Sequence, residues 1–163
     1  MEKGRACVLN NEKLEFTLRE YDVSPPEEGN VVLKMKRSGL CGTDVHIHTG
    51  KLGMPGEEII IGHEFIGEIT ETGADADKDG LGNPVAAGDT AIACVAKPCG
   101  ECPSCTRGEA ASCMNFGVTY FAEPSDPPHF HGGFADYLFS SAENIVKVPE
   151  DMDLDAVAAF PCA

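Results

Sequence analysis

The sequence has little positive charge and no long apolar run. Its 163 residues include 12 Lys and Arg against 27 Asp and Glu, a formal net charge of −15. A phosphate backbone would be repelled by this charge, which disfavours nucleic-acid binding. No apolar stretch approaches the roughly 18 residues of a membrane span, and the start "MEKGRACVLNNEKLEF" lacks the apolar core of a signal peptide. We therefore expect a cytoplasmic protein that binds neither nucleic acid nor membranes.

The apolar residues favour a mainly β fold. With 42% hydrophobic residues, the chain can bury one core, which favours a single domain over residues 1–163. Runs such as "KLEFTLREY", with Leu14, Phe16 and Leu18, "VVLKMKR", "FIGEITETG" and "NIVKVP" alternate apolar and polar residues between Gly, Pro and Asn. This pattern is typical of short strands in a barrel or sandwich. Only the end, "DMDLDAVAAFPCA", looks helical, with Asp151 or Asp153 as its cap.

Four of the eight cysteines lie within fifteen residues, "CGECPSCTRGEAASC". Cys99, Cys102, Cys105 and Cys113 read C-x2-C-x2-C-x7-C, and four thiolates can close a tetrahedron around a structural zinc ion. A reducing compartment favours metal ligation over disulfides. The bacterial ferredoxin run also begins C-x2-C-x2-C but continues x3-C-P, whereas here the gap is seven and Met114 follows. Zinc is favoured over an iron–sulfur cluster and over buried thiols without metal.

A second group of polar residues lies in "GLCGTDVHIHTG" and "IIIGHEFIG". One thiolate and one imidazole are half of a catalytic zinc site, which keeps a position open for water or substrate. Each residue alone also has an ordinary structural explanation, such as a buried thiol, a turn residue or a hydrogen-bonded core histidine. The residues concerned are Cys41, Thr43, Asp44, His46, His63 and Glu64.

Four motifs in this order resemble the zinc-dependent medium-chain alcohol dehydrogenases, a family that includes threonine and sorbitol dehydrogenases. They are "GLCGTDVH", "GHEFIGEI", "CGECPSC" with Cys113, and "GGFADY". The resemblance covers the whole chain and implies a GroES-like, partly open β-barrel with few short helices. It also implies a structural zinc in a lobe at about residues 94–116, a small alcohol or aldehyde as substrate, and NAD or NADP as the hydride carrier.

The resemblance further implies a second, catalytic zinc. Cys41 and His63 match two of its ligands, and Cys162 falls where many members of the family place the third. Glu64 resembles the acidic neighbour that can approach or ligate the metal.

The family's proton path can be carried over in the same way. Thr43 resembles the hydroxyl that receives the alcohol proton, and His46 resembles the next group in the relay. Asp44 resembles the carboxylate that holds a ligand histidine by its other ring nitrogen.

One expected part of the family is missing. No stretch reads G-x-G-x-x-G, the glycine-rich turn of the Rossmann cofactor domain that follows in the family. We therefore expect a dissected or truncated catalytic domain that does not turn over alone; a homo-oligomer of the full-length enzyme is compatible with the sequence. Two alternatives are a noncatalytic scaffold stabilised by zinc and an iron–sulfur electron carrier.

An acidic stretch, "DADKDGLGN", partly matches the sequence pattern of a calcium-binding loop. Asp75, Asp77 and Asp79 are spaced as in such a loop, but Ala86 stands at the position that requires Glu. An acidic surface turn is the better prediction.

Overall fold

The fold is mainly β, as the alternation of apolar residues predicts. A computed structural model describes residues 2–94, 98–115, 121–158 and 160–162. Its strands are β1 (Lys3–Asn10), β2 (Glu15–Asp22), β3 (Asn30–Ser38), β4 (Glu58–Ile59), β5 (Glu64–Thr72), β6 (Thr90–Cys94), β7 (Tyr137–Ser141) and β8 (Ile145–Lys147). The α-helices are α1 (Gly42–His48), α2 (Pro103–Thr106) and α3 (Leu154–Val157), and the 3-10 helices are η1 (Ala110–Ser112), η2 (Ala142–Asn144) and η3 (Phe160–Cys162). None of the described helices is long and apolar enough to cross a membrane.

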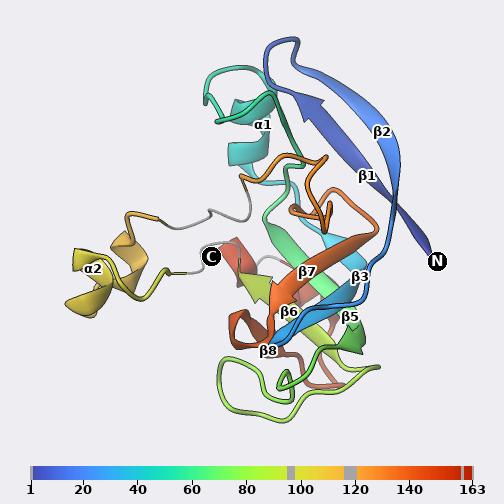
Figure 1. Cartoon of the computed structure of the whole chain (residues 1–163), viewed down its shortest axis with the longest axis vertical. Helices are drawn as coiled ribbons and strands as arrows, with labels where there is room; N and C mark the ends of the chain where they lie inside the picture. Colours follow the sequence, from blue (N-terminus) through green and yellow to red (C-terminus); the bar gives the residue numbers. More distant parts are fainter. Residues whose placement is uncertain (1, 95–97, 116–120, 159, 163) are drawn as a thin grey trace.

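The strands form two antiparallel sheets that curl around the core. The larger sheet has the order β7-β3-β5-β6-β8 and the smaller one β2-β1-β4. A bridge between Ala6 and Ala135 connects the two. The main core cluster lies inside the larger sheet and includes Leu33, Phe65 and Ile69, each at most 2% exposed. Figure 1 shows α2 in a lobe set apart from the strands, and α1 beside the smaller sheet.

Helix α3 agrees with the sequence prediction, whereas α1 was not predicted. The Asp153 carboxylate accepts a hydrogen bond from the Asp155 N–H and caps α3. Helix α1 begins after Cys41, and its N-terminus is closed by a capping box between Cys41 and Asp44. Because Ser and Thr are the usual first residues of this motif, a cysteine there conceals the signal. The expectation that only the end of the chain is helical is therefore wrong.

Strand β2 differs from its predicted burial. The alternation of Phe16 and Leu18 indicates a buried face, yet these side chains are 39% and 65% exposed. Strand β2 lies at the edge of the smaller sheet and pairs only with β1 among the described strands. An apolar alternation reports the period of a strand and not whether its face is covered.

The acidic stretch forms a turn, but one of its carboxylates is buried. Asp79 is 4% exposed and accepts hydrogen bonds from the N–H groups of Leu81, Asn83 and Lys147 at 2.9, 2.8 and 3.0 Å. The bond from Lys147 covers the outer edge of β8. The turn is therefore confirmed, although Asp79 does not lie on the surface.

A second carboxylate covers the outer edge of β4. Glu123 accepts hydrogen bonds from the N–H groups of Glu57 and Glu58 at 2.8 and 3.3 Å. The carboxylates of Asp79 and Glu123 thus accept hydrogen bonds from backbone N–H groups that a further strand could otherwise bind.

We expect Asp79→Ala to lower the free energy of unfolding by about 1–3 kcal/mol, because the buried N–H donors lose their acceptor. Burial alone would raise the pKa of Asp79, but hydrogen bonds from Lys147, Asn83 and Leu81 together lower it below its ordinary value of 3.8. The contribution is therefore present above that value and is lost as the pH falls through the folded-state pKa. Urea unfolding at neutral and acid pH measures both effects.

Asp77→Ala is the matched control, because it removes an exposed carboxylate from the same turn. Equal destabilisation by the two substitutions would contradict the role given to Asp79.

Candidate functional site

The residues of the second polar group converge where α1 begins and β5 begins. Ligand atoms of Cys41, His63 and Glu64 all lie within 4.8 Å of one another. Cys41 precedes α1, whereas His63 and Glu64 stand at the start of β5. Cys41 and Glu64 are partly buried, and His63 is only 9% exposed, so the surrounding protein restricts all three side chains. A thiol, an imidazole and a carboxylate at these distances can share one metal ion.

Asp44 fixes the geometry of this group. Its carboxylate is 2% exposed and accepts hydrogen bonds from the N–H of Cys41 at 2.9 Å and from the N–H of Gly62 at 3.1 Å. Its Oδ1 atom also lies 3.3 Å from Nδ1 of His63. When Nδ1 donates its proton to this carboxylate, the other ring nitrogen of a neutral imidazole keeps its lone pair for a ligand.

The same contacts shift the pKa values of the pair. The hydrogen bond to Asp44 raises the pKa of His63 to about 9, although burial of the ring acts in the opposite direction. Burial alone would raise the pKa of Asp44, but its hydrogen bonds with His63, Cys41 and Gly62 lower it. The raised pKa of His63 favours a protonated ring, so a metal that binds this nitrogen must compete with a proton.

Gly39 leaves space for the side chain of Glu64. The Gly39 N–H donates to the Glu64 carbonyl at 2.9 Å, so the two residues lie side by side. A Cβ atom added at Gly39 would meet the Glu64 carboxylate, with Cδ at 2.8 Å and Cβ at 2.9 Å. Gly39 is the first residue of the motif "GLCGTDVH", but no role was predicted for it from the sequence.

The two candidate relay residues lie on α1. The Cys41 thiol donates to Oγ1 of Thr43 across 3.7 Å, which places the Thr43 hydroxyl beside the candidate metal ligands. His46 follows one turn later, and both side chains are exposed. Within the described ranges no contact joins the two side chains, so the relay stays a prediction. The side chain of Cys162, the predicted third ligand, lies outside what the structure describes.

The four lobe cysteines form a second, more compact group. The Sγ atoms of Cys99, Cys102, Cys105 and Cys113 lie within 4.8 Å of one another, and those of Cys102 and Cys113 are 4.0 Å apart. Four sulfurs at the usual zinc–sulfur distance would be about 3.8 Å apart, so this spacing fits a tetrahedral ion. The described lobe cysteines form no disulfide.

Backbone N–H groups point at these sulfurs. Cys99 donates to Sγ of Cys113 at 3.3 Å, and Cys102 donates to Sγ of Cys99 at 3.4 Å. Hydrogen bonds from the backbone of Cys105 and Met114 lower the pKa of Cys102 to about 6. These donors favour the thiolate of Cys102, the form in which cysteine binds metals, whereas burial raises the pKa of Cys105 to about 12. The lobe thus has the donor set of a closed structural site.

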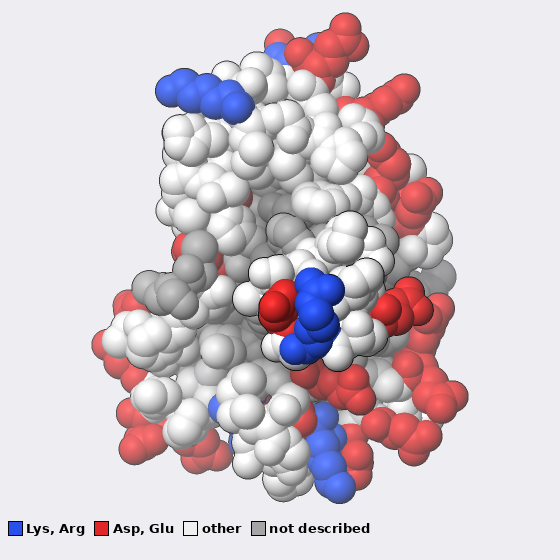
Figure 2. All heavy atoms as spheres, turned by 90° about the vertical axis from the view of Figure 1, so that its left-hand side faces the viewer, with Lys and Arg blue, Asp and Glu red and all other residues white. Residues whose placement is uncertain are grey.

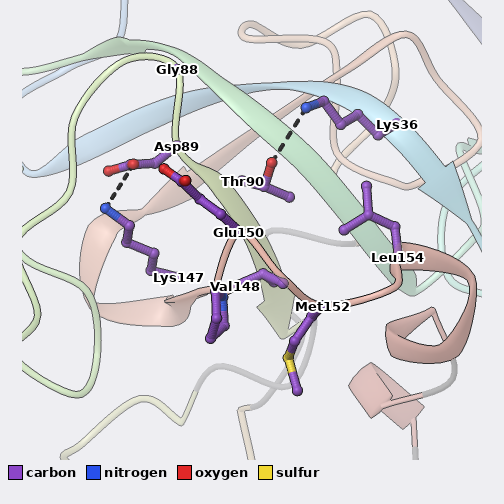
Figure 3. Close-up of a pocket in the computed structure, with 10 residues that line it drawn as sticks. Lys36, Gly88, Asp89, Thr90, Lys147, Val148, Glu150, Met152 and Leu154 are labelled. Carbon is purple, nitrogen blue, oxygen red and sulfur yellow. Dashed lines mark hydrogen bonds and ion pairs between the residues drawn. The ribbon is translucent and has the colours of Figure 1, made fainter.

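A surface pocket of about 250 Å³ lies elsewhere, between the start of β6 and the segment after β8. Figure 3 shows Lys147 paired with Asp89 and Lys36 bonded to Thr90, at 2.7 and 3.3 Å. Lys36 also pairs with Glu68 at 2.9 Å. Since both lysines already have partners and none of the predicted site residues lines this pocket, we place the functional site at Cys41 and His63.

The surface charge is unevenly distributed. Figure 2 shows acidic side chains along the right-hand side and the lower part of the face toward the lobe, a basic side chain beside an acidic one near its middle, and a mostly uncharged area above these two. An uncharged surface is compatible with small neutral molecules and offers little attraction for a phosphate backbone.

Comparisons with known proteins agree with the fold and the motifs. The family model of the alcohol dehydrogenase GroES-like domain matches residues 27–150. Cinnamyl alcohol dehydrogenase 8 of Arabidopsis thaliana is 32% identical over 148 residues, which cover 91% of this chain and 38% of that protein. The chain therefore belongs to the alcohol dehydrogenase GroES-like domain family, and it spans well under half the length of this curated relative.

Solved structures confirm the architecture. An alcohol dehydrogenase from Thermotoga maritima matches with a TM-score of 0.88 at 29% identity, covering 99% of this chain and 45% of that chain. A cobalt- and zinc-bound thermostable alcohol dehydrogenase from Pyrobaculum aerophilum matches with a TM-score of 0.75 at 25% identity, covering 98% and 45%. The predicted GroES-like, partly open barrel with few short helices is confirmed.

We expect Gly39→Ala to weaken Zn²⁺ binding at Cys41 and His63 by about 10- to 100-fold, the usual effect of disturbing a group beside a metal. The added methyl group would occupy the space of the Glu64 carboxylate. Competition with a colorimetric chelator measures the affinity, and the visible spectrum of the cobalt-substituted protein reports the change in ligands.

Gly42→Ala is the matched control, because a Cβ atom there would meet no atom within 4 Å. In a Glu64→Ala background, Gly39→Ala should cause a smaller further loss of affinity, because the carboxylate is gone and only the close approach to Cβ of residue 64 remains. An undiminished second loss would show that Gly39 does not act through Glu64.

Proposed function

We propose that this chain is the catalytic domain of a zinc-dependent alcohol or polyol dehydrogenase. The enzyme would oxidise an alcohol to a carbonyl compound and transfer a hydride to NAD or NADP. The observation that carries the proposal is the convergence of Cys41, His63 and Glu64, with Thr43 beside them and Asp44 holding the imidazole. The membership of the chain in an alcohol dehydrogenase domain family supports it.

The donor sets fit two zinc ions with different tasks. Four thiols fill every position of a tetrahedral site and leave none for substrate, as in structural zinc sites. Cys41 and His63 supply fewer donors, with Glu64 close by, which leaves room for a substrate oxygen. We propose Cys162 as the third protein ligand of this site. The similar alcohol dehydrogenase from Pyrobaculum aerophilum was solved with cobalt and zinc bound, which supports the choice of metal.

The residues of the chain would handle the alcohol and its proton. Zinc, when bound, would supply a Lewis acid that lowers the pKa of the alcohol hydroxyl. The Thr43 hydroxyl, placed beside Cys41, would accept the hydroxyl proton, and His46 would pass it to solvent. Asp44 would keep His63 oriented through Nδ1. The hydride would leave the carbinol carbon for the nicotinamide, so the substrate loses one proton and one hydride in total.

A second domain outside this chain would bind the nicotinamide. The chain matches only 38% of Arabidopsis thaliana cinnamyl alcohol dehydrogenase 8 and 45% of the Thermotoga maritima structure. The proposed unit is thus a catalytic domain over residues 1–163, with its zinc-binding lobe at about residues 94–116. Alone, it would bind metal but would not turn over. Cysteines that bind a metal must stay reduced, and the cytoplasm keeps thiols reduced. We therefore propose a cytoplasmic location for this enzyme.

We expect two zinc ions per chain and the loss of one in Cys102→Ser. Removing one thiolate from the closed site should also lower thermal stability, because metal binding there contributes to folding. Elemental analysis and thermal unfolding of freshly purified protein measure the two effects.

Cys94→Ser is the control, because Cys94 is exposed and lies outside both ligand groups. Iron with sulfide, or no metal at all, would refute the zinc assignment. A wild-type value of one zinc, retained in Cys102→Ser, would reject the lobe as a zinc site.

In the full-length enzyme, we expect Thr43→Ala to lower turnover by roughly 10²- to 10⁴-fold, the usual loss when acid–base assistance is removed. Stability should hardly change, since the side chain is exposed. Steady-state oxidation of an alcohol, followed by nicotinamide absorbance, measures turnover.

Thr49→Ala is the control, because it makes the same chemical change just after α1, where the hydroxyl donates to the carbonyls of Val45 and His46 at 2.7 and 3.4 Å. Full activity of Thr43→Ala would refute the proton path even if both zinc sites were correct.

A further inference from the structure

The outer edge of β2 carries unpaired backbone groups. On β1, the Cys7 N–H donates to the Phe134 carbonyl, and the Arg5 carbonyl accepts from the Asp136 N–H. These backbone groups of Cys7 and Arg5 therefore point away from β2. Leu18 stands opposite Cys7 in the ladder. Because backbone groups alternate along a strand, the N–H and C=O groups of Phe16, Leu18 and Glu20 point outward. Within the described part of the chain, no backbone group pairs with them.

The side chains along this edge are also unusual. Phe16 and Leu18 project on the same face of β2 and are 39% and 65% exposed. The His48 ring stacks on Phe16, with the two ring centroids 5.0 Å apart. Edge strands are normally blunted because they bind other strands. Asp79 and Glu123 do this for β8 and β4, whereas β2 has eight residues and no such cover among the described residues. The edge of β2 therefore offers unpaired backbone donors and acceptors to another strand.

The sequence of β2 indicates which strand it accepts. The stretch "EFTLR", residues 15–19, is complementary to itself when read in the opposite direction. With Thr17 of two copies opposite each other, Phe16 lies opposite Leu18 and Glu15 lies opposite Arg19, each twice. Opposite charges and aromatic–aliphatic pairs across strands are stabilising. We propose that β2 pairs antiparallel with β2 of a second copy of this chain and forms a homodimer.

Other registers satisfy the same backbone groups but lack this complementarity. Centring the pair on Leu18 places Phe16 opposite the Glu20 carboxylate and pairs no charges. Centring it on Arg19 places two guanidinium groups opposite each other, which is destabilising. Of these three registers, the one centred on Thr17 matches both the apolar and the charged residues. The Arg19 guanidinium, which already binds Glu58 of its own copy, would then lie between that carboxylate and Glu15 of the second copy.

The dimer is a weak one. A single pair of edge strands buries less area than a stable interface, which places it among transient contacts. Each copy also carries a net charge of −15, so the two copies repel each other at low ionic strength. Added salt should therefore strengthen the dimer until it screens the pairs between Glu15 and Arg19.

Sedimentation equilibrium of the 163-residue chain tests the proposal. The measurement covers about a hundredfold range of protein concentration, in reducing buffer with moderate salt. We expect a reversible monomer–dimer equilibrium. Leu18→Lys and Glu15→Lys should each raise the dissociation constant about tenfold or more, because each substitution acts twice in a symmetric dimer. The controls are Leu81→Lys and Glu28→Lys, which make the same charge changes at exposed positions outside β2 and should leave the constant unchanged.

Amide hydrogen exchange reports the register. Protection of the Phe16 and Leu18 amides should rise with protein concentration, while the Thr17 and Arg19 amides, which face β1, should stay protected throughout. A chain that is monomeric at every concentration would overturn the proposal, including the case in which β2 instead binds a different protein. A dimer whose dissociation constant is unchanged by both Leu18→Lys and Glu15→Lys would overturn the proposal as well.

Discussion

The buried carboxylate of Asp44 is the constraint on which the candidate site depends. A carboxylate with 2% exposure is costly unless its oxygens are satisfied, and here three donors meet it: the N–H groups of Cys41 and Gly62 and the ring of His63. These donors come from the start of α1 and from the segment leading into β5. One side chain therefore joins two distant parts of the sequence and arranges the donor atoms before any metal binds.

Much of the fold could be predicted, because short strands carry their alternation in the local sequence. The residues after Asn30, Phe65 and Thr90 are strands as expected. Helix α1 could not be predicted in the same way. Gly42 and the β-branched residues that follow it have low helix propensity, and the capping box uses a cysteine. Packing of Ile47 against the smaller sheet stabilises this helix, and that contact is tertiary.

Those residues of the candidate site that belong to sequence motifs could be predicted from the sequence. Cys41, His63 and Glu64 were expected from their motifs, and the structure brings their donor atoms together. The role of Gly39 could not be read from the sequence, because a glycine reveals only that a side chain is missing and not which neighbour uses the space. The burial of Asp79 depends in the same way on Lys147, a residue far along the chain.

Glu123 determines how far an assembly built on β2 can grow. Two copies joined through β2 share one sheet of the order β4-β1-β2-β2-β1-β4, and both outer strands of that sheet are β4. The Glu123 carboxylate already accepts hydrogen bonds from the N–H of Glu58 in β4 and of Glu57 just before it. In the proposed pair the contact is isologous, so each copy uses the same surface. The short length of β4 and the Glu123 carboxylate would therefore both oppose growth of the sheet beyond two copies.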